Sequence, residues 1–408
     1  MANKEEYYVG LDVGSSKISV VVGQPDEEGV LNIIGIGISK NTGLKKGVVS
    51  EVEETVSGVS EAIEMAEGVS GLQISSAMVN INGGHISSTN SRGVVAVAKA
   101  DQEITSNDII RAEDAAQAIQ IPANKELLHV IPRFFSIDNG EPIKDPIKMS
   151  GVRLEVETHL IAVSSQAAKN ITRCVTQAGV NVEDIIVSPL AAAKASLTKK
   201  QRELGCVMVD IGAATTGLTV FIDDSVLYTK VFPIGAASIT NDIAIGLRTS
   251  VDVAEKIKIK YGNAVAADVS EASKIDLSAI DISEEGVVPT RHVAEIIQDR
   301  SEEIFRLILD ELRKIKHDSL LPAGVVLTGG GAKLIGVEEL AKSFFRLPVN
   351  IGKPHSLGGL TEKIYDPSFS TAIGLMLYSY EEKEAIGGPE WVKITIERVK
   401  KIFKIFLP

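Results

Sequence analysis

Short apolar runs and amphipathic segments alternate along this chain. Residues 7–13 and 17–22 are apolar runs that predict two β-strands joined by a tight turn, and residues 31–39 predict a third strand. Residues 51–66 predict a helix, because Val and Ile recur on one helical face at spacings of four, three and four. Strands that alternate with helices in this way are typical of α/β proteins.

A similar plan recurs in the second half of the chain. Strands are predicted within residues 205–220 and 324–331, and helices at residues 239–246, 251–261, 293–315 and 337–345. Residues 84–157 interrupt the first half with a small α/β pattern of their own. We therefore expect a first half (1–83 and 158–204), an inserted subdomain (84–157), a second half (205–228 and 301–380) with a smaller subdomain (229–300), a linker (381–390) and a C-terminal segment (391–408).

One strand-and-turn motif occurs twice. Asp12 ends an apolar strand and precedes Gly14 and two serines, and Asp210, 198 positions later, precedes Gly212 and two threonines. Glycine permits close backbone approach, exposed turn amides and hydroxyls can hold phosphate oxygens, and a carboxylate at a strand end suits a hydrated Mg²⁺ ion. One copy alone is read as an ordinary β-turn. Two copies facing each other would clamp a polyphosphate from both sides.

A glycine run supplies a third candidate. Gly329, Gly330 and Gly331 follow the apolar run VVLT and precede a predicted helix. A flat base or sugar can lie against such a backbone, although a tight strand-to-helix turn has the same pattern. The chain contains neither G-x-x-x-x-G-K-[ST] nor G-x-G-x-x-G after a strand, so neither common phosphate loop is predicted.

Composition narrows the function classes. The formal net charge is −12 and aromatic residues make up 4%, which argues against a nucleic-acid-binding surface. The two cysteines, Cys174 and Cys206, are too few for a disulfide framework or a cysteine zinc cluster. No signal-peptide pattern and no window of about 20 apolar residues occurs, so we expect a cytosolic chain without a spanning helix.

The C-terminal segment has a separate character. Residues 391–408 contain five Lys or Arg and one Glu, which leaves about −16 on the rest of the chain. Its apolar residues recur at spacings of four, three, four and three, and lysines lie mainly opposite, as in an interfacial membrane helix. We expect the membrane contacts to come from Trp391, Val392, Ile396, Val399, Lys400, Lys401, Phe403, Lys404 and Phe406. The alternative is a C-terminal helix docked on its own core.

Rough magnitudes predict reversible attachment to anionic lipid. Half-burial of five or six apolar side chains gives about 5–6 kcal/mol, and about four net positive charges add roughly 4 kcal/mol. Immobilisation removes at least about 4 kcal/mol. A single copy would bind modestly, and a row of copies in a filament would bind far better.

The ordered set of motifs resembles the actin/Hsp70/sugar-kinase superfamily. The order is a hairpin at 12–17, a connecting helix that begins Ser188-Pro189, a hairpin at 210–216, the glycine motif at 329–333 and a closing helix at 371–378. Within this superfamily the chain resembles the FtsA family of bacterial cell-division proteins. The insert at 84–157, the string GVVLTGGG and the basic amphipathic tail carry that resemblance. It implies an actin-like two-domain ATPase fold of the α/β class.

The resemblance also implies a nucleotide site for ATP and Mg²⁺. Asp12 and Asp210 would approach the ion through water. Phosphates would be held by Gly14, Ser15, Ser16, Lys17, Gly212, Thr215 and Thr216. The nucleoside side would comprise Gly329, Gly330, Gly331 and Lys333, together with Glu255 and Lys258, which otherwise lie on a solvated helix face.

One position departs from relatives of this superfamily. Hsp70 and MreB-type proteins begin the connecting helix with Glu-Pro, and that Glu is thought to position the attacking water. Ser188 stands there in this chain. A hydroxyl is a poor substitute for a carboxylate in accepting a proton from water, so we expect at most slow ATP hydrolysis.

The function implied by the resemblance is that of an ATP-dependent membrane adaptor. It would bind the C-terminal peptide of the tubulin-like GTPase FtsZ near residues 225–300, polymerise with itself and meet other divisome proteins at the cytoplasmic face of the cell membrane, at the division site. One alternative is a catalytic ATPase or kinase of the same fold, for which no catalytic carboxylate is identified. Another is an FtsA-like pilus-assembly scaffold, which would not need a lipid-binding tail.

Overall fold

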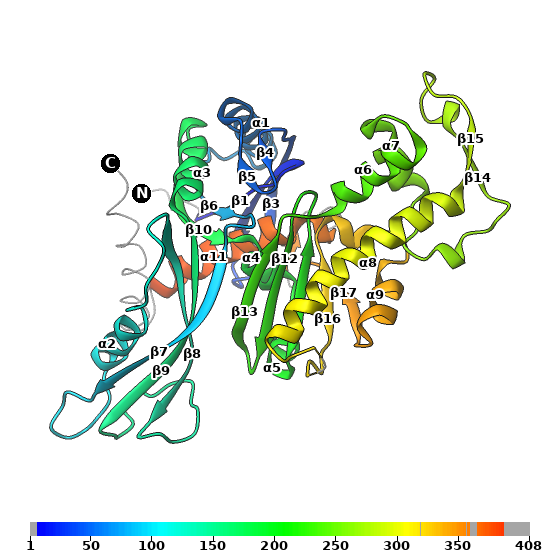
Figure 1. Ribbon diagram of the computed structural model, residues 1–408. Helices are drawn as coiled ribbons and strands as arrows, with labels where there is room; N and C mark the ends of the chain where they lie inside the picture. Colours follow the sequence, from blue (N-terminus) through cyan, green and yellow to red (C-terminus); the bar gives the residue numbers. More distant parts are fainter. Residues whose placement is uncertain (1–5, 319, 356, 360–364, 387–408) are drawn as a thin grey trace.

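Two β-sheets form the framework of the molecule (Figure 1). The computed structural model describes residues 6–318, 320–355, 357–359 and 365–386. The first sheet has the spatial order β10 (Asn181–Val187), β6 (Ser76–Ile81), β1 (Tyr8–Val13), β2 (Lys17–Pro25), β3 (Leu31–Lys40) and β18 (Gly358–Gly359). The second has the order β13 (Ser225–Phe232), β12 (Thr216–Ile222), β11 (Cys206–Ile211), β16 (Val325–Thr328) and β17 (Val349–Ile351).

The two sheets repeat one topology. In each, an antiparallel hairpin (β1–β2 or β11–β12) continues through parallel neighbours on one side (β6 and β10, or β16 and β17). The strands β1 and β11 are almost wholly buried because their apolar runs have helices or sheet on both faces. The repeat places the two Asp-x-Gly hairpins at equivalent positions.

Helices cover the sheets and join the halves. Those of the first half are α1 (Val52–Ser70), α3 (Ser165–Gln177), α4 (Ser188–Ser196), α5 (Lys199–Leu204) and the closing helix α11 (Ser370–Ile386). The sequence placed α11 and β18 in the second half, but α11 packs on α4 and β1 and β18 pairs with β3, so both belong to the first half. α4 and α11 touch backbone to backbone, since a Cβ added at Gly374 would lie 1.7 Å from the Ala191 carbonyl oxygen. This close crossing lies between the two sheets.

The insert projects from one side of the first half, at the lower left in Figure 1. It consists of β7 (Ser87–Ala96), α2 (Ser106–Ala116), β8 (Lys125–Ile137) and β9 (Arg153–Ser164), with β9 central in a three-stranded antiparallel sheet. β9 runs unbroken through the boundary expected after residue 157. Sequence reasoning split this strand because it contains the polar pair Thr158 and His159, which the fold buries.

A smaller subdomain projects from the second half, at the upper right in Figure 1. It contains α6 (Ala236–Leu247), α7 (Val251–Tyr261), β14 (Lys274–Asp276), β15 (Val287–Pro289) and the first part of α8 (Thr290–Lys314), while α9 (Val337–Phe345) packs beside β17. The expected borders at 228/229 and 300/301 both fall inside an element, β13 and α8 respectively.

The expected linker at 381–390 is wrong for its first part. Residues 381–386 continue helix α11, because charged residues such as Glu381 are good helix formers and this one pairs with Lys194. The remaining linker residues and the predicted membrane helix at 391–408 lie outside the described residues. No helix within the described part of the chain is long and apolar enough to cross a bilayer.

Candidate functional site

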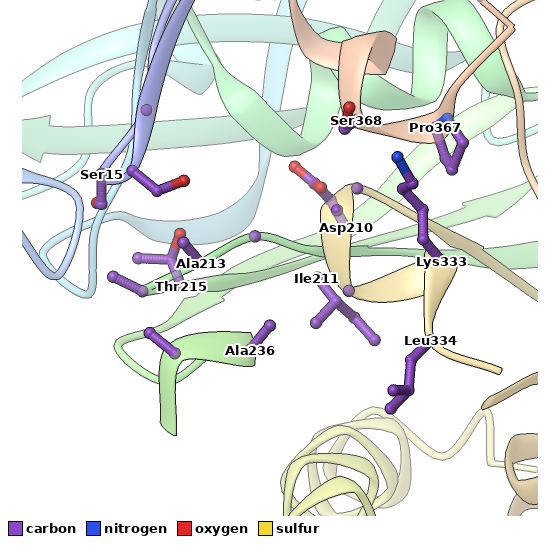
Figure 2. A pocket seen from close by; sticks show the side chains of 18 of the residues that line it. Ser15, Asp210, Ile211, Ala213, Thr215, Ala236, Lys333, Leu334, Pro367 and Ser368 are labelled. Carbon is purple, nitrogen blue, oxygen red and sulfur yellow. The ribbon is translucent and has the colours of Figure 1, made fainter. Parts of the chain in front are cut away.

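A cavity of about 630 Å³ lies between the two halves (Figure 2). Both Asp-x-Gly hairpins, the glycine turn and the smaller subdomain line it. The predicted site residues that line it are Asp12, Gly14, Ser15, Ser16, Lys17, Asp210, Gly212, Thr215, Glu255, Lys258, Gly329, Gly330, Gly331 and Lys333, and Ser188 also reaches its wall. The fold thus gathers at one place residues that are separated by up to about three hundred positions.

The two hairpins have the same turn geometry. The Gly14 N–H donates to the Lys17 carbonyl oxygen at 3.1 Å, and the Gly212 N–H donates to the Thr215 carbonyl oxygen at 2.9 Å. In both strands the aspartate precedes this glycine by two residues. The repeated sequence therefore makes a repeated structure, with one turn from each half lining the same cavity.

Asn80 holds the first carboxylate. Its side-chain amide donates to Asp12 Oδ1 at 2.7 Å and to Ser188 Oγ at 3.0 Å, and its oxygen accepts from the Val13 N–H at 2.7 Å. One buried amide thereby fixes the end of β1, the carboxylate and the start of α4. Sequence reasoning missed Asn80, although an Asn inside a buried apolar strand is itself a signal that its amide must be satisfied.

Asp210 lies opposite, at the end of β11. Its carboxylate is 9% exposed and accepts a hydrogen bond of 3.4 Å from the Thr371 hydroxyl. Gly329 adopts φ +82°, and a Cβ there would lie 2.3 Å from Asp210 Oδ1, so only glycine fits beside this carboxylate.

Burial dominates the electrostatics of the two carboxylates. It raises the pKa of Asp12 to about 7, an effect that Lys17 opposes and Asp210 reinforces. Burial also raises the pKa of Asp210 to about 6, against the hydrogen bond from Thr371. The cavity therefore disfavours two uncompensated negative charges, and a cation between them would relieve this cost.

Two lysines reach the cavity at the end where Pro367 and Ser368 lie. Lys17 Nζ donates to Ser368 Oγ at 3.1 Å and lies 4.1 Å from the centroid of the Phe369 ring. Burial lowers the pKa of Lys17, while Asp12 and Asp366 oppose that shift. Lys333 pairs with Asp366, and Figure 2 shows it beside Asp210 and Pro367.

Glu255 and Lys258 form an ion pair on α7 in which the Lys258 side chain is largely buried and that of Glu255 is more exposed. Lys258 Nζ lies 2.7 Å from Glu255 Oε2 and donates to Thr240 Oγ1 at 2.8 Å, and the Lys258 side chain is only 13% exposed. The open alternative of a solvated helix face is therefore wrong for Lys258. Sequence reasoning did not identify Thr240, because it lies on the neighbouring helix α6.

Thr216 is the predicted residue that the fold leaves out of the cavity. It is fully buried in β12, and its hydroxyl donates to the Ile234 carbonyl oxygen at 2.9 Å. The turn ends at Thr215, so strand alternation carries the next side chain to the interior. Asn82, also missed, donates to Thr215 Oγ1 at 3.0 Å and braces the second turn from the first half.

Comparison with known proteins adds independent evidence. The family model described as "Cell division protein FtsA" matches residues 207–374, and the one described as "SHS2 domain inserted in FTSA" matches residues 83–162. Cell division protein FtsA of Pseudomonas aeruginosa is 41% identical over 375 residues, which are 92% of this chain and 89% of that protein. The chain belongs to the FtsA family.

Two other FtsA proteins are also similar to this chain over most of its length. FtsA of Bacillus subtilis (strain 168) is 37% identical over 400 residues, which are 98% of this chain and 89% of that protein. FtsA of Escherichia coli (strain K12) is 34% identical over 389 residues, 93% of this chain and 92% of that protein. The resemblance inferred from the sequence is confirmed, and the protein is an FtsA-type cell-division protein.

Solved structures confirm the actin-like fold. A chain of the PilM-PilN type IV pilus biogenesis complex aligns with TM-score 0.65 and 16% identity over 92% of this chain and 99% of that one. MreB5 of Spiroplasma citri bound to ADP aligns with TM-score 0.57 and 12% identity over 94% of this chain and 99% of that one. At these identities the likeness concerns the fold alone. It agrees with the α/β actin-like fold expected from the sequence.

Proposed function

We propose that this FtsA-family protein binds Mg-ATP between its halves and attaches FtsZ filaments to the cytoplasmic face of the cell membrane at the division site. The observation that carries the nucleotide part is the pair of like turns, one from each half, that line one cavity. The family supplies the cell-division context. The crystal structure of MreB5, which shares the fold, contains bound ADP, and this supports the same nucleotide class.

The residues present fit ATP and Mg²⁺. Two buried carboxylates with raised pKa values, Asp12 and Asp210, match the preference of a hydrated Mg²⁺ ion for oxygen ligands and retained water. Bound Mg²⁺ would supply positive charge to the phosphates. The turn amides after Gly14 and Gly212 and the ammonium of Lys17 would bind and orient phosphate oxygens.

The opposite end of the cavity fits a nucleoside. Glu255 and Lys258 bring polar groups to a wall that also contains the apolar side chains Ile259 and Ile335, which are 73% and 63% exposed. Exposed apolar side chains flanking a glycine turn suit the faces of a flat base. Lys258 is already positioned by Thr240, so little ordering is needed for it to meet a ribose or base.

Slow hydrolysis is part of the proposal. Ser188 is 1% exposed, and its hydroxyl is engaged by Asn80 and by the Ile81 carbonyl oxygen at 3.3 Å. This hydroxyl is a weak base and is not free to accept a proton from water. We expect turnover well below about 1 s⁻¹, the lower end of common enzyme rates. Faster release of phosphate would show that another group orients the water.

Calorimetry with Mg-ATP tests the nucleotide site. Asp210→Ala should weaken binding at least about tenfold, because a charged ligand contact is lost. Asp101→Ala, at an exposed position of the insert, is the matched control and should bind as the parent does. Equal affinities for Asp210→Ala and the parent would remove the basis of this proposal.

The partner surface is proposed on the smaller subdomain. Exposed apolar side chains gather in this part of the sequence, where Ile245 is 75% and Ile282 is 98% exposed. Exposed apolar residues mark a protein-docking surface where they form a contiguous patch. We expect Ile245→Glu to weaken binding of the FtsZ C-terminal peptide in fluorescence anisotropy while Mg-ATP affinity is kept. A peptide affinity that does not change would move the docking surface elsewhere. Self-polymerisation and contacts with other divisome proteins belong to the same proposal.

A further inference from the structure

A second cavity, of about 310 Å³, lies apart from the nucleotide site. It lies where the first half, the second half and the insert meet, it is partly open, and its walls come from β8, β10, α4, α5, β12, β13 and α11. Its volume is at the lower end of the range for small-molecule sites, about 300–1,000 Å³. Apolar side chains such as Ile131, Leu190 and Phe221 form most of its wall.

Two neutral side chains in this wall each have one polar atom without a hydrogen-bond partner among the described residues. Within the described part of the chain, neither the Tyr378 hydroxyl nor His129 Nδ1 makes a hydrogen bond. The Val187 N–H donates to His129 Nε2 at 3.2 Å, so the ring proton is on Nδ1. Burial lowers the pKa of His129 to about 4 and, with Glu381, raises that of Tyr378, so both groups are neutral donors at pH 7.

Two cations stand at the same wall with their counter-ions toward solvent. The Lys194 side chain is 28% exposed and pairs with Glu381, which is 55% exposed. The Arg202 side chain is 25% exposed, and its Nε lies 2.7 Å from Asp224, which is 32% exposed. Each cation is the more buried member of its pair. Lys194 and Arg202 also line the cavity, whereas Glu381 and Asp224 do not, so the positive ends of the two pairs are the ones that face it.

We propose that this cavity is a binding site for a small amphipathic carboxylate, with its apolar body against Leu190 and Phe221 and its carboxylate on the donors of Tyr378, His129 and Arg202. An apolar wall with a few converging donors is the usual composition of a small-molecule site. A carboxylate accepts from several donors at once, and the wall offers donors of both neutral and charged kinds.

The site is coupled to the nucleotide cavity by two helices. α4 contributes Ser188 to the first cavity and Leu190 to the second, and α11 contributes Thr371 to the first and Tyr378 to the second. Because Gly374 lies directly on Ala191, neither helix can shift along the other alone. A ligand bound between α4 and α11 would shift the two halves relative to each other and so change the affinity for nucleotide. This consequence rests on the proposed nucleotide function.

Calorimetry with 3-phenylpropionate on the full chain, without nucleotide, tests the site. We expect a dissociation constant of about 1 mM or tighter, with binding at least about fivefold weaker for the matched amide, 3-phenylpropionamide, which lacks the charge. Ala193→Leu fills the cavity and should abolish binding. Tyr378→Phe removes one donor and should weaken binding about fivefold.

Matched controls separate this site from others. Tyr7→Phe removes a hydroxyl that donates to the Gln73 carbonyl oxygen at 2.6 Å, away from the cavity, and should leave probe affinity unchanged. Undetectable binding to the parent, or unchanged affinity in Ala193→Leu or Tyr378→Phe, would overturn the proposal. Tyr378→Phe is conservative enough to fold even if Ala193→Leu does not.

The coupling has its own readout. Saturating 3-phenylpropionate should change the Mg-ATP dissociation constant by about fivefold or more, and Mg-ATP should change the probe's by the same factor. Equal Mg-ATP affinities with and without the probe would overturn the coupling. Failure of Mg-ATP to bind at all would instead contradict the proposed nucleotide function, and the nucleotide-free titration would still decide the site.

Discussion

At the residue scale, the two cavity aspartates give the protein a pH-dependent stability. The pKa of Asp210 is raised from 3.8 to about 6 and that of Asp12 from 3.8 to about 7 in the folded state. Between the unfolded and folded pKa values, the folded state holds more protons than the unfolded state. Stability is therefore highest below about pH 4 for these groups and falls as the pH rises through about 7.

Asp210→Asn should flatten this dependence. An amide has no charge to desolvate, so the variant should gain free energy of unfolding at pH 8 relative to the parent, by at most about 3 kcal/mol, with roughly half that gain at pH 5. Urea unfolding without nucleotide at the two pH values measures this. A larger gain at pH 5 than at pH 8 would contradict the assigned direction.

Asn80 is the residue on which the first carboxylate depends. Asn80→Ala leaves the Val13 N–H and Asp12 without their partner, so we expect a loss of about 2–4 kcal/mol in the free energy of unfolding and weaker Mg-ATP binding. Asn32→Ala, which removes an exposed hydrogen bond to Asp26 at 3.0 Å, should change stability by about 0.5 kcal/mol or less. Urea unfolding and calorimetry compare the pair, and similar losses in both variants would count against the role of Asn80.

At the scale of elements, the insert is fastened to the edge strand β13 of the second sheet. Ser88 Oγ donates to the Thr229 carbonyl oxygen at 2.7 Å and accepts from the Thr229 N–H at 3.2 Å. His159 is fully buried, with Nδ1 at 2.7 Å from Asn90 Oδ1 and Nε2 at 3.1 Å from Thr229 Oγ1. Side chains of the insert thus satisfy backbone groups that an edge strand leaves open.

Thr229→Val should loosen this attachment. The buried His159 ring loses a partner, so we expect a loss of about 1–3 kcal/mol in stability and faster hydrogen exchange in β7 and β13. Thr89→Val, at an exposed position on β7, is the control. Exchange that rises equally in both variants would argue against the attachment.

The C-terminal segment is predicted from its pattern alone. Phe403→Glu puts a charge where hydrocarbon is expected, at a cost of a few kcal/mol, comparable to the whole estimated binding energy. We expect this variant to stay in the supernatant when pelleted with anionic liposomes, and Ile282→Glu, at an exposed apolar position elsewhere, to pellet as the parent does. A chain ending at Gly388 that pellets like the full chain would favour the docked-helix alternative.

At the scale of the whole molecule, the cavity proposed to hold nucleotide lies between two halves that share part of one hydrophobic core, since Met208 and Val326 of the second sheet pack in the same cluster as Leu11 and Val79 of the first. Mg-ATP at about 100 times its dissociation constant should add about 2.7 kcal/mol to the free energy of unfolding. Hydrogen exchange should slow in both turns, 14–17 and 212–215, because each contributes one wall. Protection of one turn alone would mean that the ligand does not bridge the halves.

Local pattern determined much of this protein. The spacing of apolar residues predicted α7 and α9 with their observed ends, because helix periodicity depends only on residues that are close in the sequence. The repeat of Asp-x-Gly located both turns, because a tight turn depends on a few consecutive residues. The ordered motifs and the insert were enough to indicate the FtsA family, which the comparisons confirm.

The tertiary structure decided what lies next to what. Asn80 meets Asp12, Asn82 meets Thr215, and Thr371 meets Asp210 across separations of 68 to 161 positions, which no local pattern encodes. β9 crosses the expected border, and Thr216 turns into the core, because burial and strand alternation in the assembled sheets override local polarity. The second cavity has no sequence signature, since residues of the first half, the second half and the insert line it together.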